Sequence, residues 1–166
     1  MTRPARRVAL CGVLTALMLI LGYVEQLLPL SAALPGVKLG LSNAVLLFAL
    51  YTLSTPIALM LMVLKVLLTS ALFAGFGAAP YAFAGGLMSL CVMALLRRMK
   101  GISPVTVSMA GGAMHSAAQV LLAMAITRTP GLVGYMGLTM LLGLACGLLT
   151  GIAAALTLRH LRHIFT

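Results

Sequence analysis

The sequence contains a single acidic residue, Glu25, and its apolar residues gather into six long stretches. Of its 166 residues, 63% are hydrophobic and only 7% are charged. A water-soluble domain carries far more charge, about a quarter of its residues. The chain is therefore expected to fold in a lipid bilayer, where apolar side chains face their natural solvent.

The six apolar stretches predict helices rather than strands. They are continuous and lack the alternation that the strands of a membrane barrel show, and a helix satisfies its own backbone in lipid. The expected fold class is all-α, a polytopic membrane protein with a single bundle of six transmembrane helices in one domain, residues 1–166. Helices are expected over residues 8–30, 39–53, 56–73, 81–96, 105–126 and 132–158. The second is short, because about 20 residues cross a bilayer.

Basic residues lie mostly on one side of this arrangement. With the N-terminus inside, the outer connections hold only Lys38 and Arg128, whereas the inner ones hold Arg3, Arg6, Arg7, Arg97, Arg98, Lys100, Arg159 and Arg162. The positive-inside rule then places both termini in the cytoplasm. It also explains the net charge of +10 without nucleic acid, so membrane lipid is the expected surrounding. The first apolar run is long for a secretory signal, and its cleavage is not expected.

Two stripes of small residues allow close approach between helices. One repeats every four residues along the last stretch, at Gly143, Gly147, Gly151 and Ala155. The other lies in and before the first stretch, at Ala5, Ala9, Gly12 and Ala16. From spacing alone, each stripe fits packing within the bundle or docking onto another membrane protein.

Three polar residues lie deep in the apolar stretches. Lys65 is near the middle of residues 56–73, where an ionisable group is costly and usually faces the bundle interior, unless its long side chain reaches an interface. His115 and Gln119 are one turn apart on one face of residues 105–126. Such a pair suits a hydrogen-bonded ligand, or else contacts with neighbouring helices.

The first outer connection, Pro35-Gly36-Val37-Lys38-Leu39-Gly40-Leu41-Ser42-Asn43, has more turn formers than a simple linker needs. Its backbone N–H groups and Lys38 could hold an anion. A plain bend with Asn43 capping the next helix is the alternative. Arg128 lies on the same outer side, either adding positive charge or lying at a solvated rim. The predicted ligand-binding residues are therefore Lys38, Asn43, Lys65, His115, Gln119 and Arg128.

Several kinds of chemistry lack the residues they need. The chain has no aspartate and no GxxxxGK[ST] phosphate loop, and its cysteines at positions 11, 91 and 146 are isolated. Magnesium-diphosphate chemistry normally recruits several carboxylates. No catalytic residue, metal site or cofactor is expected, and whether the chain is an enzyme stays open, with a non-enzymatic role favoured.

The stretch from Pro35 to Asn43, followed by Gly111-Gly112-Ala113-Met114-His115 and Gln119, resembles a bacterial family over nearly the whole chain. That family is called heptaprenyl diphosphate synthase component I, or Gx transporters. Ser116 departs from its pattern, in which Asn is expected after the histidine, so no ligand contact is carried over to position 116.

The family is similar to the substrate-binding S components of energy-coupling-factor (ECF) vitamin transporters, which are six-helix membrane proteins of this size. The resemblance implies a location in the bacterial cytoplasmic (inner) membrane. It also implies a transmembrane coupling subunit and ATPases as partners, with Ala5, Ala9, Gly12 and Ala16 forming the docking face.

The expected function is therefore that of a membrane-embedded, substrate-binding subunit of a small-molecule uptake transporter. Its basic and polar residues favour an anionic or amphipathic ligand, such as a quinone precursor, an isoprenoid or a flavin-like molecule. One alternative is a non-catalytic membrane subunit, component I, of heptaprenyl diphosphate synthase. Another is a membrane anchor of a redox or quinone-related complex.

Overall fold

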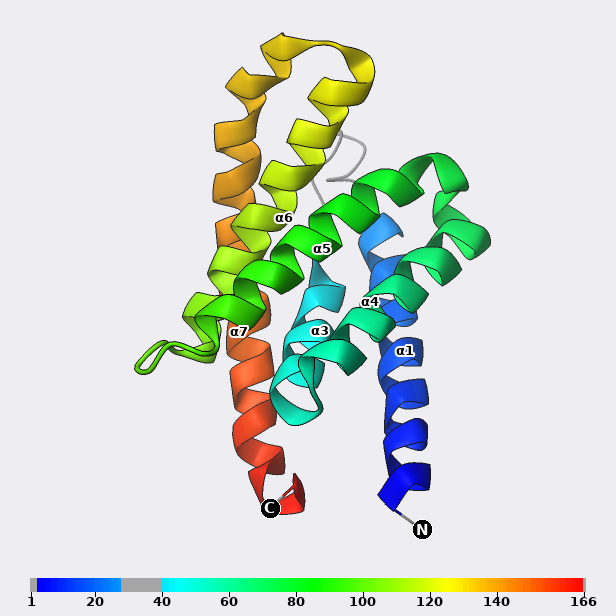
Figure 1. Cartoon of the computed structure of the whole chain (residues 1–166), viewed down its shortest axis with the longest axis vertical. Coiled ribbons are helices and arrows are strands. Elements are labelled where there is room, and N and C mark those ends of the chain that lie inside the picture. Colours follow the sequence, from blue (N-terminus) through cyan, green and yellow to red (C-terminus); the bar gives the residue numbers. More distant parts are fainter. Residues whose placement is uncertain (1–2, 28–39, 166) are drawn as a thin grey trace.

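The computed structural model describes residues 3–27 and 40–165, with side chains over 5–27 and 40–160, and every regular element in this part of the chain is helical. Figure 1 shows the arrangement. The α-helices are α1 (Arg3–Leu27), α3 (Leu41–Thr52), α4 (Thr55–Thr69), α5 (Ala79–Leu96), α6 (Pro104–Thr127) and α7 (Val133–Phe165). Short helical turns occur at η1 (Ser70–Ala74), η2 (Phe76–Ala78) and η3 (Pro130–Leu132). The prediction of an all-helical chain is confirmed.

Five helical segments of the described part are long and apolar enough to cross a membrane: Ala5–Leu27, Thr55–Ala74, Phe76–Leu96, Pro104–Thr127 and Pro130–His160. The sixth, α3, has 12 residues and is shorter than a bilayer requires. By length and composition, these helices are compatible with a multi-pass membrane protein.

Helix ends follow local chemistry more closely than hydropathy. The first helix begins at Arg3 rather than residue 8, and the last continues to Phe165 rather than residue 158. Arginine, alanine and leucine all favour helix, so a change from apolar to basic residues does not end one. By contrast, Gly75 adopts φ 76° and ends the run that begins with α4. The predicted helical residues 28–30 and 39 lie outside the described part.

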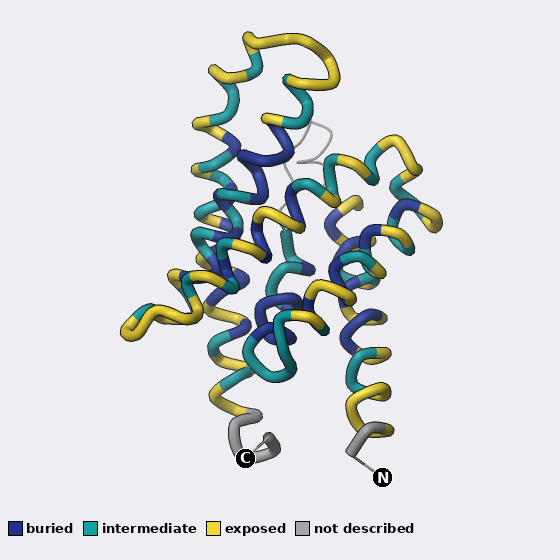
Figure 2. The backbone as a smooth tube through the Cα atoms, in the orientation of Figure 1, coloured by how far each residue is buried: buried dark blue, intermediate teal, exposed yellow. Residues whose placement is uncertain are grey.

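Helix α3 lies in the centre of the molecule. Its residues 45–50 are all buried, so it has no face turned to lipid along this run (Figure 2). It packs against α1, α4 and α7. Near its end, the guanidinium of Arg97, the residue that follows α5, donates to the Leu50 carbonyl and lies over the Tyr51 ring, 5.3 Å from its centroid. A cation therefore ties the end of α5 to the end of α3.

Helices α6 and α7 contact each other through their backbones. A Cβ atom on Gly147 would lie 2.6 Å from the Ser108 carbonyl oxygen and 2.7 Å from the Met109 Cα. Next to this contact, the hydroxyls of Ser108 and Thr150 are 3.2 Å apart. The glycines of the α7 stripe are thus used for packing inside this chain, as small residues are in other membrane bundles.

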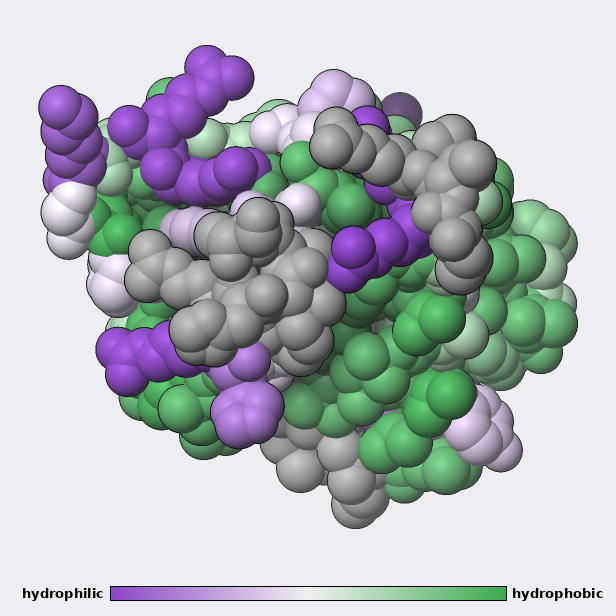
Figure 3. All heavy atoms as spheres, turned by 90° about the horizontal axis from the view of Figure 1, so that it is seen from below, coloured by the Kyte–Doolittle hydropathy of each residue, from purple (hydrophilic) through white to green (hydrophobic). Residues whose placement is uncertain are grey.

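The start of α1 and the end of α7 lie at the same end of the described structure. Figure 1 places the start of α1 and the end of α7 together at the bottom, and the α6–α7 connection with Arg128 at the top. Seen from below, hydrophilic side chains gather on the bottom face (Figure 3). Exposed basic residues near the helix ends include Arg6, Arg7, Arg97, Arg98, Lys100 and Arg159. The basic residues are therefore distributed unevenly, as the sequence predicts.

We expect Gly147→Ala to destabilise the protein by about 1–3 kcal/mol, because its methyl group forces two packed backbones apart. Gly137→Ala on the same helix is the matched control, since no atom lies within 4 Å of its added Cβ. That control should be neutral or gain up to about 1 kcal/mol, because alanine favours helix over glycine. Unfolding in mild detergent measures both free energies. Equal changes in the two variants would contradict the backbone contact.

Candidate functional site

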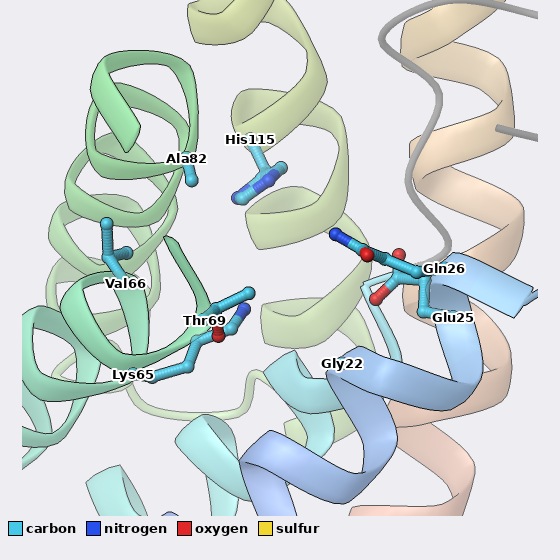
Figure 4. Close-up of a pocket in the computed structure, with 8 residues that line it drawn as sticks. All are labelled: Gly22, Glu25, Gln26, Lys65, Val66, Thr69, Ala82 and His115. Carbon is cyan, nitrogen blue, oxygen red and sulfur yellow. The ribbon is translucent and has the colours of Figure 1, made fainter. Parts of the chain in front are cut away.

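A small cavity lies where four helices meet (Figure 4). Its volume is about 50 Å³, which is room for on the order of four water molecules. Its walls come from α1, α4, α5 and α6, through Gly22, Glu25, Gln26, Lys65, Val66, Thr69, Ala82 and His115. The cavity therefore brings a lysine together with a histidine and a glutamate, in a chain that has three histidines and one acidic residue.

Helix α1 contributes three cavity residues from one face. Glu25 and Gln26 follow Gly22 by three and four residues, so both lie on the side of the helix that carries Gly22. Gly22 is buried, yet no atom lies within 4 Å of where its Cβ would be. The missing side chain therefore leaves the space that the cavity occupies.

The Glu25 carboxylate also contacts the beginning of α3. Its Oε1 accepts a hydrogen bond of 2.5 Å from the backbone N–H of Gly40. Gly40 is the N-cap of α3 and has φ 66°, a left-handed conformation that glycine adopts easily. The first N–H groups of a helix have no partner within it, and a negative charge is favourable there. The only acidic residue of the chain thus joins α1 to α3 at 8% exposure.

Helices α4 and α6 supply the basic side of the cavity. Lys65 and Thr69 are one turn apart on α4, and His115 enters from α6 at 6% exposure. In Figure 4, Lys65 and Thr69 lie on the α4 side, and Glu25 and Gln26 lie on the α1 side. The carboxylate of Glu25 and the amine of Lys65 therefore lie on different walls of one space.

Gln119 lies next to the cavity, behind His115. A Cβ atom on Gly85 of α5 would lie 2.9 Å from the His115 Cε1 and 3.0 Å from the Gln119 Cγ. Gly85 therefore allows α5 to pack directly on both side chains. The Gln119 Oε1 and the Thr69 Oγ1 are buried with no hydrogen-bond partner among the described residues. Buried polar atoms of this kind usually bind water or a ligand.

The other predicted ligand-binding residues lie in different places. Asn43 is in the first turn of α3, and its Nδ2 is 2.8 Å from the position of a Cβ on Gly40, so it lies beside the Glu25–Gly40 contact. Arg128 is exposed at the end of α6, at φ 53°, and does not line the cavity. Lys38 lies outside the described residues. The structure thus brings Lys65 and His115 into one cavity, with Gln119 next to it.

Sequence analysis did not assign Glu25, Gln26 or Thr69 to the site. The signals were present, because Thr69 follows Lys65 by one helical turn and Glu25 is the only acid. Glu25 lies within the predicted helix of residues 8–30 but was not assigned to the site, whereas the structure places it on a cavity wall.

The small residues of α1 lie on the surface. Ala5, Ala9, Gly12 and Ala16 are all exposed, and no atom lies within 4 Å of a Cβ added to Gly12. This differs from Gly143, Gly147 and Gly151 of α7, which are buried against α6. The glycines of the α7 stripe therefore pack against α6, whereas the residues of the α1 stripe are exposed.

The family described as heptaprenyl diphosphate synthase component I matches residues 14–157. This range contains every residue that lines the cavity. No curated protein and no solved structure matches the chain. Because the match covers most of its length, the chain belongs to the heptaprenyl diphosphate synthase component I family.

Proposed function

We propose that this chain is the membrane-embedded, substrate-binding subunit of a small-molecule uptake transporter. The observation that carries the proposal is the cavity, where Lys65, His115 and Glu25 meet between helices of a membrane protein. Ionisable groups within membrane helices are costly and usually serve a substrate or ion path. A bound polar ligand would contact groups that lipid cannot solvate.

We propose that the chain lies in the bacterial inner membrane with both termini in the cytoplasm. Exposed basic residues near the start of α1, near the end of α7 and in the α5–α6 connection, which lies in the lower half of Figure 1, support this orientation. In the full proposal, α3 counts as the sixth helix of the bundle. Ligand then enters from the opposite side, where α1 ends near the cavity.

The proposal also includes a transmembrane coupling subunit and ATPases as partners. The sequence has no phosphate-binding loop, so energy for uptake would come from another chain. The exposed stripe of Ala5, Ala9, Gly12 and Ala16 supports docking through α1. Small side chains allow the close helix contact on which association in lipid depends.

A second candidate is a non-catalytic subunit of heptaprenyl diphosphate synthase, and the family's own description favours it. With no aspartate and one glutamate, this chain lacks the carboxylates that hold magnesium diphosphate. Catalysis would then lie on a partner chain.

Gentle purification followed by native mass spectrometry separates the two candidates. Transport predicts a retained small molecule and co-purified ATPase subunits, whereas the synthase role predicts a co-purified soluble prenyltransferase. A preparation with neither a retained ligand nor ATPase subunits, but with the prenyltransferase, would reject the transport proposal.

We expect Lys65→Met to lower the affinity for the retained ligand by about tenfold or more, because a hydrogen bond to a charged group is worth about 1.5–3 kcal/mol. Lys100→Met is the matched control, since Lys100 is exposed in the connection between α5 and α6. The shift in unfolding temperature on adding the retained ligand measures both. Equal shifts in wild type and Lys65→Met would remove Lys65 from the site.

Two neighbouring glycines of α5 test the role of His115. The methyl group of Gly85→Ala meets the His115 ring and Gln119, so it should displace them and reduce ligand binding several-fold. The methyl group of Gly86→Ala meets the Met62 Sδ at 3.0 Å, on a flexible side chain that can move aside. Ligand titration of both variants should therefore show a loss only at position 85. A loss of equal size at position 86 would count against His115.

Bulky residues on the α1 stripe test the docking face. Gly12→Leu and Ala16→Leu should abolish co-purification of the coupling subunit while leaving the chain inserted and folded, because no atom of the described residues lies within 4 Å of a Cβ added to Gly12. Ala145→Leu is the control, since it adds the same bulk at an exposed position of α7. Unchanged recovery of every membrane partner in both α1 variants would limit the stripe to a lipid-facing role.

A further inference from the structure

The cavity has a carboxylate on one wall and an ammonium group on another. Glu25 and Gln26 enter from α1, Lys65 and Thr69 from α4, and His115 from α6 (Figure 4). Sequence analysis predicted an anionic or amphipathic ligand from the basic and polar residues, before the structure placed Glu25 in the same cavity as Lys65. With Glu25 included, the formal charges of Glu25 and Lys65 balance when His115 is neutral.

This balance restricts the ligand. A simple anion bound to Lys65 would bring a second negative charge close to Glu25, and a simple cation bound to Glu25 would be repelled by Lys65. In a membrane interior these repulsions are weakly screened. A group that carries both charges satisfies both walls at once.

We propose that the cavity binds a small zwitterionic group, with its ammonium toward Glu25 and Gln26 and its anionic end toward Lys65 and His115. This inference rests on the proposed ligand-binding function. The cavity of about 50 Å³ suits such a group better than a whole isoprenoid or flavin. A free amino-acid-like solute and the headgroup of phosphatidylethanolamine share this chemistry.

The geometry of Glu25 supports its role in recognition. Its hydrogen bond with the Gly40 N–H holds the carboxylate in place, and this bond uses one of about four lone-pair positions. Gln26 adds an amide on the same wall. A carboxylate fixed in this way is oriented before the ligand binds, which favours affinity.

The test uses the full chain in lipid-free detergent and measures the unfolding temperature with matched probes. β-Alanine carries both charges, propionate lacks the ammonium and propylamine lacks the carboxylate. Phosphatidylethanolamine is compared with the anionic lipid phosphatidylglycerol, to test whether a lipid headgroup supplies the zwitterionic group. We expect one zwitterionic probe to bind about tenfold more tightly than its matched single-charge probes, as loss of a charged hydrogen bond predicts.

Two variants should each remove one part of the preference for the zwitterion, either over the anion or over the amine. Glu25→Gln keeps an oxygen acceptor for Gly40 but removes the charge, so the zwitterion should lose its advantage over the anion. Lys65→Met should remove its advantage over the amine. Gln26→Leu gives a second measure of the α1 wall without altering the Glu25–Gly40 bond, should Glu25→Gln fold poorly.

Several results would overturn the proposal. The first is that propionate or propylamine binds to wild type as tightly as the zwitterionic probes do. The second is that neither β-alanine nor phosphatidylethanolamine binds. If Glu25 only stabilised the start of α3, Glu25→Gln would lower the unfolding temperature and leave the probe preference unchanged. A retained ligand without an ammonium group would reject the zwitterion but leave the transport proposal standing.

Discussion

The close contact between the backbones of α6 and α7 is the constraint on which the cavity depends. Lipid gives helices little hydrophobic reason to associate, so packing must hold them together. Glycines at positions 112, 143 and 147 remove the side chains that would separate the two backbones. With one face of α6 held against α7, its buried His115 and Gln119 meet Gly85 of α5. The rigid hairpin therefore positions the histidine of the site.

Much of the fold follows from the sequence because lipid imposes simple requirements. Continuous apolar runs predicted helices, and the prolines at positions 56, 80 and 104 lie in first turns, where proline is tolerated. The extensions of α1 to Arg3 and α7 to Phe165 were missed. The apolar run marks the part of a helix that lies in the membrane, whereas helix propensity determines how far the helix continues beyond it. The burial of α3 depends on its neighbours, which no local pattern reveals.

The site was harder to predict than the fold. Lys65 and His115 stood out because charged or titratable groups are rare in apolar helices, and the structure places both on one cavity. That Glu25 and Gln26 share this cavity depends on how α1 packs, which the sequence does not encode locally. Whether these residues and Gln119 bind a ligand stays a prediction. Arg128 is exposed at the end of α6 and does not line the cavity, so its assignment to a ligand site stays a prediction.

The short central helix has a consequence for how the protein is made. Twelve residues of α3 rise about 18 Å, less than the hydrocarbon thickness of about 30 Å. Both of its ends contact charged side chains, at Gly40 through Glu25 and at Leu50 through Arg97. Arg97 follows Leu50 by 47 residues, so the ribosome delivers that contact only after α4 and α5 have been synthesised. The contact at the Leu50 end of α3 can therefore form only after α5 has been made, later than the synthesis of α3 itself.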